Sequence, residues 1–345
     1  MKVLVVNNAV PFIRGGAEEL ADNLVTQLRA RPGVSAELLR LPFNWMPSER
    51  VIEEIVIAQS LVLYNVDCVI GLKFPAYLVP HNDKRFWILH QFRQAYDLGD
   101  AGQGWSDQGR EGALREAVRK ADNAAFADGK RLFVNSPVTA DRLARYNNFK
   151  AEVLYPPLND AHLFVGGEDE GYIFAGGRVS PGKRQDLLIE AWARAGARAP
   201  RLVIAGPPES QAYADQLRDA VARYGLDDRV DLKFGFHPRS DIAAWVNGAR
   251  ACAYLPYDED SLGYVAMEAF AGAKPVLTTT DSGGLLEMVN EGTGIVAAPT
   301  AEAIADALMI LAQTPDEAAR RGRAAKAYWG SRGFTWDATL DRLLA

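Results

Sequence analysis

The sequence predicts an α/β protein made of two doubly wound parallel sheets in series. Short continuous apolar runs alternate with helix-period segments, and this alternation pauses once near the middle of the chain. Continuous Val, Ile and Leu runs are typical of parallel strands that are buried on both faces. The chain has 345 residues, of which 48% are hydrophobic, so each of two domains can have its own core.

Ten apolar runs are predicted strands, five in each half of the chain. Those of the first half are Val3–Val6, Cys68–Ile70, Phe86–Leu89, Leu132–Val134 and Val153–Leu154. Those of the second half are Ile173–Ala175, Leu202–Ala205, Val230–Phe234, Ala251–Leu255 and Val276–Thr278. After the first strand, Leu20, Leu24 and Leu28 recur at the spacing of one helix face. Strands that alternate with helices indicate parallel sheets.

The predicted domain boundary lies between the two series of strands. Tyr155–Asn159 contains two prolines and resists regular structure, and Gly166–Gly171 is polar and rich in glycine. We therefore expect an N-terminal domain at residues 1–160, a C-terminal domain at 161–330 and a terminal helix at 331–345, with a cleft between the domains.

The overall composition excludes several classes of protein. A net charge of −6 does not suit a general nucleic-acid binder. Cys68 and Cys252 stand far apart in apolar runs, which is typical of buried thiols in a reducing compartment. The first apolar stretch is too short for a signal peptide, and no run of about 18 apolar residues predicts a membrane span. We expect a cytoplasmic protein.

Two glycine-containing loops follow predicted strands, where open α/β sheets bind ligands. Gly15 and Gly16 open the first helix, where backbone N–H groups can approach an anion; a flexible loop before a helix would explain them equally well. After Ile173–Ala175 comes the run GGRVSPGKR, in which Arg178 offers a planar fork of donors and Lys183 a mobile charge. These cations are predicted to neutralise a leaving diphosphate.

An acidic segment follows the strand Ala251–Leu255. Asp260 lies in the loop after this strand, and Glu268 lies on the next helix with seven residues between the two acids. Gly263 leaves backbone N–H groups exposed near the start of that helix, which suits phosphate or sugar oxygens. A carboxylate at Glu268 can accept hydrogen bonds from two vicinal hydroxyls, such as those of a ribose.

These segments together resemble glycosyltransferase family 4, a family of retaining enzymes with the GT-B fold. The acidic segment resembles the family's E-x7-E signature, and Gly-Gly-Arg with Lys183 five residues after Arg178 resembles its diphosphate clamp. Gly15-Gly16-Ala17-Glu18 resembles its N-terminal glycine loop, and TTTDSGGLLE resembles the segment after its acidic helix. The resemblance covers nearly the whole chain in the family's order. It implies two Rossmann-like domains that face a central cleft, a nucleotide-sugar donor, no required metal and no cofactor.

The resemblance also implies roles for individual residues. The first acid would lie by the hydroxyls of the donor sugar, but Asp260 is one methylene shorter than the usual Glu, so Glu259 remains an alternative. Asp258 and Asp260 also form a D-x-D pattern, which holds a metal in other glycosyltransferases; it overlaps the better-explained motif, and we expect no metal. His90, at the end of the strand Phe86–Leu89, is predicted to be a hydrogen-bonding group at the reaction centre. The predicted donor-binding residues are Gly15, Gly16, Arg178, Lys183, His237, Gly263, Tyr264, Val265 and Glu268.

The sequence therefore predicts a retaining, metal-independent hexosyltransferase that uses a nucleotide diphosphate sugar. The predicted acceptor is a glycan or a lipid-linked molecule, as in the synthesis of bacterial surface polysaccharide or lipopolysaccharide. The apolar loop Pro42–Pro47 would either contact a membrane or fold back on its own domain. The alternatives are a nucleotide-sugar epimerase or sugar phosphorylase on the same scaffold, and a nucleotide-sugar binder without activity.

Overall fold

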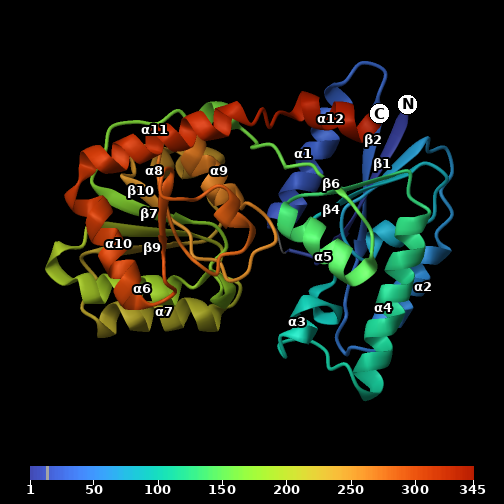
Figure 1. The fold of residues 1–345 in the computed structure, drawn as a ribbon, viewed down its shortest axis with the longest axis horizontal. Helices are drawn as coiled ribbons and strands as arrows, with labels where there is room; N and C mark the ends of the chain where they lie inside the picture. Colours follow the sequence, from blue (N-terminus) through green and yellow to red (C-terminus); the bar gives the residue numbers. More distant parts are fainter. Residues whose placement is uncertain (13–14) are drawn as a thin grey trace. The chain divides into compact units, whose positions relative to one another are not determined.

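The structure, a computed structural model, describes residues 1–12 and 15–345, which form two compact units. Unit 1 comprises Met1–Pro157 and Thr335–Ala345, and unit 2 comprises Leu158–Phe334. Each unit contains a six-stranded sheet in which neighbouring strands run parallel. Figure 1 shows each sheet with its own helices. The predicted class of two doubly wound parallel sheets is confirmed.

The sheet of unit 1 reverses its strand order next to β1. In spatial order the strands are β2 (Ser35–Pro42), β1 (Lys2–Ala9), β3 (Cys68–Gly71), β4 (Lys84–Ile88), β5 (Arg131–Val134) and β6 (Glu152–Val153). The helices are α1 (Gly16–Ala30), α2 (Arg50–Ser60), α3 (Asp97–Asp100), α4 (Gly109–Ala127), α5 (Pro137–Asn147) and α12 (Trp336–Leu344). The predicted face of α1, with Leu20, Leu24 and Leu28, packs against Val3 and Val5 of β1. Burying such a stripe is what stabilises a short amphipathic helix.

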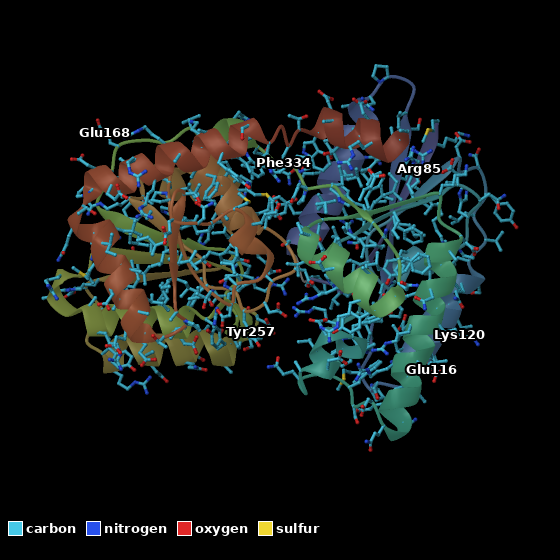
Figure 2. All side chains as sticks on the ribbon, in the orientation of Figure 1. Arg85, Glu116, Lys120, Glu168, Tyr257 and Phe334 are labelled. Carbon is cyan, nitrogen blue, oxygen red and sulfur yellow. The ribbon has the colours of Figure 1, made fainter. Side chains whose placement is uncertain are left out.

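The helix α12 completes the core of unit 1 from the far end of the sequence. Leu340 and Leu343 are buried in the same cluster as α1 and β1. Arg85 of β4, labelled in Figure 2, donates from Nη1 to the backbone carbonyl of Leu343 at 2.6 Å. The ring of Trp336 lies edge-on to that of Trp87, with 6.4 Å between the centroids. Apolar contacts and a buried hydrogen bond thus hold α12 on this unit.

The sheet of unit 2 has the strand order 3-2-1-4-5-6 of a dinucleotide-binding fold. In spatial order the strands are β9 (Val230–Phe234), β8 (Arg201–Gly206), β7 (Tyr172–Gly176), β10 (Ala251–Ala253), β11 (Val276–Thr279) and β12 (Gly294–Ala297). The helices are α6 (Gln185–Ala195), α7 (Gln211–Arg223), α8 (Arg239–Gly248), α9 (Tyr264–Ala271), α10 (Ala301–Gln313) and α11 (Pro315–Ser331). One core joins the sheet to α6, α7 and α10, with Leu188, Trp192 and Leu308 buried in it. In Figure 1, α8, α9 and α11 lie over the other face.

Each of the ten predicted strands overlaps a strand of the structure, and two strands, β2 and β12, were not predicted. Both are edge strands. β2 has the sequence SAELLRLP, in which most residues are exposed or half-buried, so it lacks the continuous apolar run of a central strand. β12 has two half-buried residues among four and is too short for a clear pattern.

Two expectations from the sequence concern buried side chains. Cys68 and Cys252 are free and buried, as predicted. In the apolar loop after β2, the ring of Phe43 packs edge-on against Phe74 and Phe92, and that of Trp45 against Phe92. These aromatic rings therefore fold back on unit 1. Within the described residues, every helix is too short or too polar to cross a bilayer.

Candidate functional site

The strand order of unit 2 reverses between β7 and β10, and the predicted donor site surrounds this point. In such sheets ligands bind outside the carboxyl ends of the strands where the order reverses. The loop after β7 carries Arg178 and Lys183, and the loop after β10 carries Glu259 and Asp260. Because β7 and β10 pair with each other, through Ile173 and Ala251 among others, these two loops leave the same edge of the sheet.

Glycines bring the loop after β7 close to its neighbours. Gly177 has φ +102°, and a Cβ there would lie 3.1 Å from Cγ2 of Val265 at the start of α9. A Cβ on Gly206 of β8 would lie 1.9 Å from the carbonyl oxygen of Gly177. The first of these contacts places the loop that carries Arg178 against the helix that carries Glu268. Arg178 itself accepts a hydrogen bond on its carbonyl from Nε2 of Gln185 at 3.1 Å.

Lys183 and Glu259, both predicted site residues, form an ion pair across the two loops. Nζ of Lys183 also lies 5.1 Å from the centroid of the Tyr254 ring. Both side chains keep about a quarter of their surface exposed, 21% for Lys183 and 26% for Glu259. The lysine is therefore oriented by its neighbours while it remains accessible to a ligand.

Arg184 has a structural role that its sequence position did not reveal. It donates two hydrogen bonds to the carboxylate of Asp281, at 2.8 and 2.9 Å. It also donates to the carbonyls of Leu255 and Pro256, both at 2.8 Å, and to the hydroxyl of Thr279 at 2.7 Å. Burial raises the pKa of Asp281, but these donors hold it below its usual range. Arg184 thus ties together the loops that follow β7, β10 and β11.

The acidic loop after β10 is held by the glycines of the TTTDSGGLLE segment. Gly283 has φ +68°, and a Cβ there would lie 2.3 Å from the carbonyl oxygen of Glu259. The N–H of Gly284 donates to that same oxygen at 2.8 Å. Asp260 is buried, with 6% of its surface exposed, whereas Glu259 faces Lys183. The two candidates for the first acid therefore lie in different surroundings.

The start of α9 requires a glycine. Gly263 has φ +75°, and a Cβ there would lie 2.7 Å from the ring of Tyr254. The helix then runs through Tyr264 and Val265 and buries Glu268, of which 5% is exposed. The carbonyl of Gly263 accepts from the N–H groups of Ala266 and Met267, at 3.1 and 3.3 Å. The start of a helix favours an anion because its backbone N–H groups point toward it.

Glu268 is paired with an arginine that the sequence did not suggest. Nη1 of Arg239 donates to Oε1 of Glu268 at 2.6 Å. His237 lies two residues before Arg239; its Nε2 is 2.9 Å from the carbonyl of Lys233, and its ring lies edge-on to that of Trp245. A carbonyl can only accept a hydrogen bond, so Nε2 of His237 is the donor and Nδ1 of a neutral ring would be an acceptor.

Gly15, Gly16 and His90, the other predicted site residues, belong to unit 1. Gly15 precedes α1, and its N–H donates to Oε2 of Glu18 at 2.8 Å, so the side chain of Glu18 caps the start of the helix. The preceding residues Ile13 and Arg14, part of the predicted glycine loop, lie outside the described residues. Nδ1 of His90 is 2.7 Å from the carbonyl of Gln91, so Nδ1 carries the proton of a neutral ring.

Burial is the main reason why His90 stays neutral. Together with the positive charge of Lys73, burial lowers the pKa of His90 to about 4. Near pH 7 the ring is therefore uncharged, with its proton on Nδ1 and a lone pair on Nε2. In that state Nε2 can accept a hydrogen bond from a hydroxyl group.

A buried polar network supports the loop that contains His90. The hydroxyls of Tyr77 and Tyr96 donate to the two carboxylate oxygens of Asp122, at 2.9 and 2.7 Å. Asn147 donates to the Tyr96 hydroxyl at 3.2 Å and accepts a hydrogen bond from the side chain of Gln91. Burial raises the pKa of Asp122 to about 7, although both phenols oppose this rise.

The D-x-D pattern was the one candidate metal motif. Among residues 1–12 and 15–345, no group of three or more His, Cys, Asp and Glu side chains is arranged to hold a metal ion. Glu259, the central residue of the pattern, is paired with Lys183. The expectation that the reaction needs no metal stays a prediction.

The match to a family model lies within unit 2. Residues 164–328 match the family described as glycosyl transferases group 1. A D-inositol 3-phosphate glycosyltransferase of Kribbella flavida is 34% identical over 196 residues, which cover 54% of this chain and 45% of the relative. Its counterpart in Streptomyces scabiei is 36% identical over 251 residues, which cover 64% of this chain and 52% of the relative. The chain thus spans about half the length of these curated relatives.

Solved structures share the fold of the whole chain at low sequence identity. Anabaena HepE in complex with UDP superposes with a TM-score of 0.74 at 18% identity, covering 100% of this chain and 98% of that one. WaaG, a glycosyltransferase involved in lipopolysaccharide biosynthesis, gives 0.71 at 15% identity and covers 99% of both chains. These likenesses establish the predicted GT-B type of fold. The match of residues 164–328 to the group 1 glycosyl transferases, together with curated relatives that are named as glycosyltransferases, supports the resemblance to family 4.

Proposed function

We propose that the chain is a retaining glycosyltransferase that moves a hexose from a nucleotide diphosphate sugar to an acceptor hydroxyl. One observation carries this proposal: cations from the loop after β7, acids from the loop after β10 and the start of α9 meet where the strand order of unit 2 reverses. A site of this kind suits a ligand with a diphosphate and several hydroxyls.

In this proposal the donor is held by its charged and hydroxyl groups. Arg178 and Lys183 neutralise the diphosphate, and the N–H groups that follow Gly263, those of Tyr264 and Val265, hydrogen-bond its oxygens. The ribose hydroxyls donate to Glu268, and the base lies near His237. Complexes of HepE with UDP and with UDP-glucose support uracil as the first base to test.

The sugar is oriented by Asp260 or Glu259. Since Lys183 already engages Glu259, Asp260 is the better candidate for the sugar hydroxyls, and Glu259 would orient the lysine. The neutral ring of His90 would accept a hydrogen bond from a hydroxyl through Nε2. The acceptor oxygen forms its bond to the anomeric carbon on the face from which the diphosphate departs. The leaving phosphate oxygen takes the acceptor proton, so neither a metal ion nor a cofactor is required.

A glycan or a lipid-linked acceptor in bacterial polysaccharide or lipopolysaccharide synthesis is our first candidate, with peripheral contact to the cytoplasmic face of the membrane. The curated relatives are named for D-inositol 3-phosphate, which makes a phosphorylated polyol the second candidate. The product distinguishes transfer from the alternatives, because an epimerase would alter the donor sugar and a phosphorylase would release a sugar phosphate.

A donor screen followed by site variants tests the proposal. UDP-, ADP- and GDP-sugars are screened by thermal shift, since a ligand at 100 times its Kd stabilises the folded state by about 2.7 kcal/mol. With the best donor, Lys183→Ala and Glu268→Ala should each lower kcat/KM for transfer or donor hydrolysis by about 10²-fold or more. Lys326→Ala, which removes an exposed lysine of unit 2 bonded to the Val165 carbonyl, is the control. Full kcat/KM in both site variants would reject the proposal, and tight donor binding without turnover would favour a non-catalytic binder.

A further inference from the structure

The carboxylate of Glu268 is in a place where an unpaired charge would be unfavourable. On α9 it is flanked by buried apolar residues, including Met267 and Ala269, and it is itself buried. A buried carboxylate stays ionised when an opposite charge and hydrogen bonds replace the lost water. Arg239 supplies both, through the 2.6 Å bond from Nη1 to Oε1. Such a charge-assisted bond also restricts the orientation of the carboxylate.

Arg239 is held in turn by the segment that opens unit 2. Its Nη2 donates to the carbonyl of Asn159 at 3.4 Å, and its Nε lies 3.7 Å from the carboxylate of Asp160. The guanidinium lies 5.0 Å from the centroid of the Phe164 ring. The arginine therefore reaches Glu268 from a position fixed by several neighbours.

The stability of α8 does not account for an arginine at this position. Arg239 is the first residue of α8, where a positive charge opposes the helix dipole. An acidic or neutral residue would suit that position better. The contact with Glu268, 29 residues away in the sequence, provides the physical reason for the arginine.

We propose that Arg239 is a positioning residue for the ribose of the donor. By holding Oε1, it fixes the orientation in which the carboxylate of Glu268 meets the ribose hydroxyls. A carboxylate offers about four acceptor positions, so Arg239 and a diol can bond to the same group. This inference rests on the proposed function, which assigns the ribose to Glu268.

Two ligands that differ only in the diol separate positioning from a general structural role. The first is whichever of UDP, ADP and GDP gives the largest thermal shift, and the second is its 2′,3′-dideoxy counterpart. Both are titrated by calorimetry into the full-length wild type, Arg239→Met, Arg239→Lys, Glu268→Gln and the double variant Arg239→Met/Glu268→Gln. Arg218→Met is the control, because Arg218 forms an exposed pair with Asp215 in the same unit.

The expected pattern is specific to the diol. Arg239→Met should weaken binding of the ribonucleotide about tenfold and leave the dideoxy ligand within about twofold of wild type. Arg239→Lys should restore part of the affinity, and the double variant should bind no worse than Glu268→Gln alone. In turnover, Arg239→Met should raise the donor KM and leave kcat nearly unchanged.

Each of the following four results would overturn the inference. Equal weakening of both ligands would mean that Arg239 only stabilises the fold, and unchanged ribonucleotide binding in Arg239→Met would mean that it has no effect on Glu268. If Glu268→Gln weakens ribonucleotide binding while Arg239→Met does not, the positioning role alone fails. If the wild type binds none of the three diphosphates, the proposed function fails and the inference fails with it.

Discussion

The two sheets share an architecture, but the polar groups around their predicted site residues differ in charge. In unit 2, arginines and lysines meet carboxylates from other loops, as in Arg184–Asp281, Lys183–Glu259 and Arg239–Glu268. In unit 1, the carboxylate of Asp122 is held by two phenols, and His90 is neutral. Fixed ion pairs suit the binding of a charged ligand, whereas neutral groups suit the hydroxyls of a sugar or an acceptor.

The difference teaches that pH should act on the two units differently. The pKa of Asp281 is held below its usual range, so this carboxylate and its arginine keep their charges throughout the neutral range. The pKa of Asp122 is about 7, so its charge changes within that range. Asp122 therefore makes the interior of unit 1 sensitive to pH near neutrality.

The largest effect is expected from Arg184→Met in unit 2. This change leaves Asp281 without its two charge-assisted bonds and frees the carbonyls of two loops, so unfolding should become easier by about 4 kcal/mol. The loss should be the same at pH 6 and pH 8, because the lowered pKa of Asp281 keeps its contribution intact above the unfolded value near 4. Urea unfolding of the wild type and the variant at both pH values measures this loss of unfolding free energy.

The matched control for this variant is Arg201→Met, which breaks an exposed pair with Asp231. Such surface pairs contribute about 0–1 kcal/mol. A similar loss in both arginine variants would contradict the role of Arg184 as a clamp.

The next-largest loss of stability is expected from a substitution in α12, the C-terminal helix that packs in the core of unit 1. Leu343→Ala removes a fully buried side chain from the core shared by α1 and α12 and should cost about 3 kcal/mol. Hydrogen exchange followed by mass spectrometry should show lost protection in Met1–Pro157 and little change in unit 2. Leu308→Ala, at a fully buried position of unit 2, should show the reverse. Equal loss in both units for either variant would mean that they unfold as one.

A smaller effect should appear as a pH dependence in unit 1. The folded state raises the pKa of Asp122 from 3.8 to about 7, so between these values the folded protein binds more protons than the unfolded chain. Stability should therefore fall as the pH rises from about 4 to about 7 and level off above that, by roughly 2–3 kcal/mol between pH 5 and pH 8. Asp122→Asn should lack this fall. Comparing the unfolding free energies of the wild type and this variant across the pH range therefore separates the contribution of Asp122 from that of other groups. An unchanged slope in the variant would disprove the assignment.

The smallest change is a spectroscopic one at His90. Its pKa of about 4 lies below the usual value of 6.5, so its ring signals should stay in the neutral position down to about pH 5. The stability that it contributes is present above pH 6.5 and declines as the pH falls toward 4. With four histidines in the chain, NMR spectra of the wild type and His90→Gln assign the signal. A midpoint near 6.5 would show that the ring is accessible to water.

The sequence predicted those parts of the fold that leave a local pattern. Central strands appear as continuous apolar runs, whereas the edge strand β2 has exposed and half-buried residues and was missed. Arg178, Lys183, Asp260 and Glu268 were singled out by spacing that resembles a family. Arg239 has no such spacing, because its partner Glu268 is close only after α8 and α9 have folded against each other. The role of Arg184 was hidden for the same reason, since Asp281 lies 97 residues away.

The path of the chain also determines the order in which the protein can mature on the ribosome. Leu340 and Leu343 belong to the first core but are translated after all of the second. The part of unit 1 that is made first therefore lacks these two leucines while unit 2 is being translated, and unit 2 can complete its folding earlier. Chaperones that protect nascent chains should consequently associate with residues near β1 and α1 until translation has passed α12.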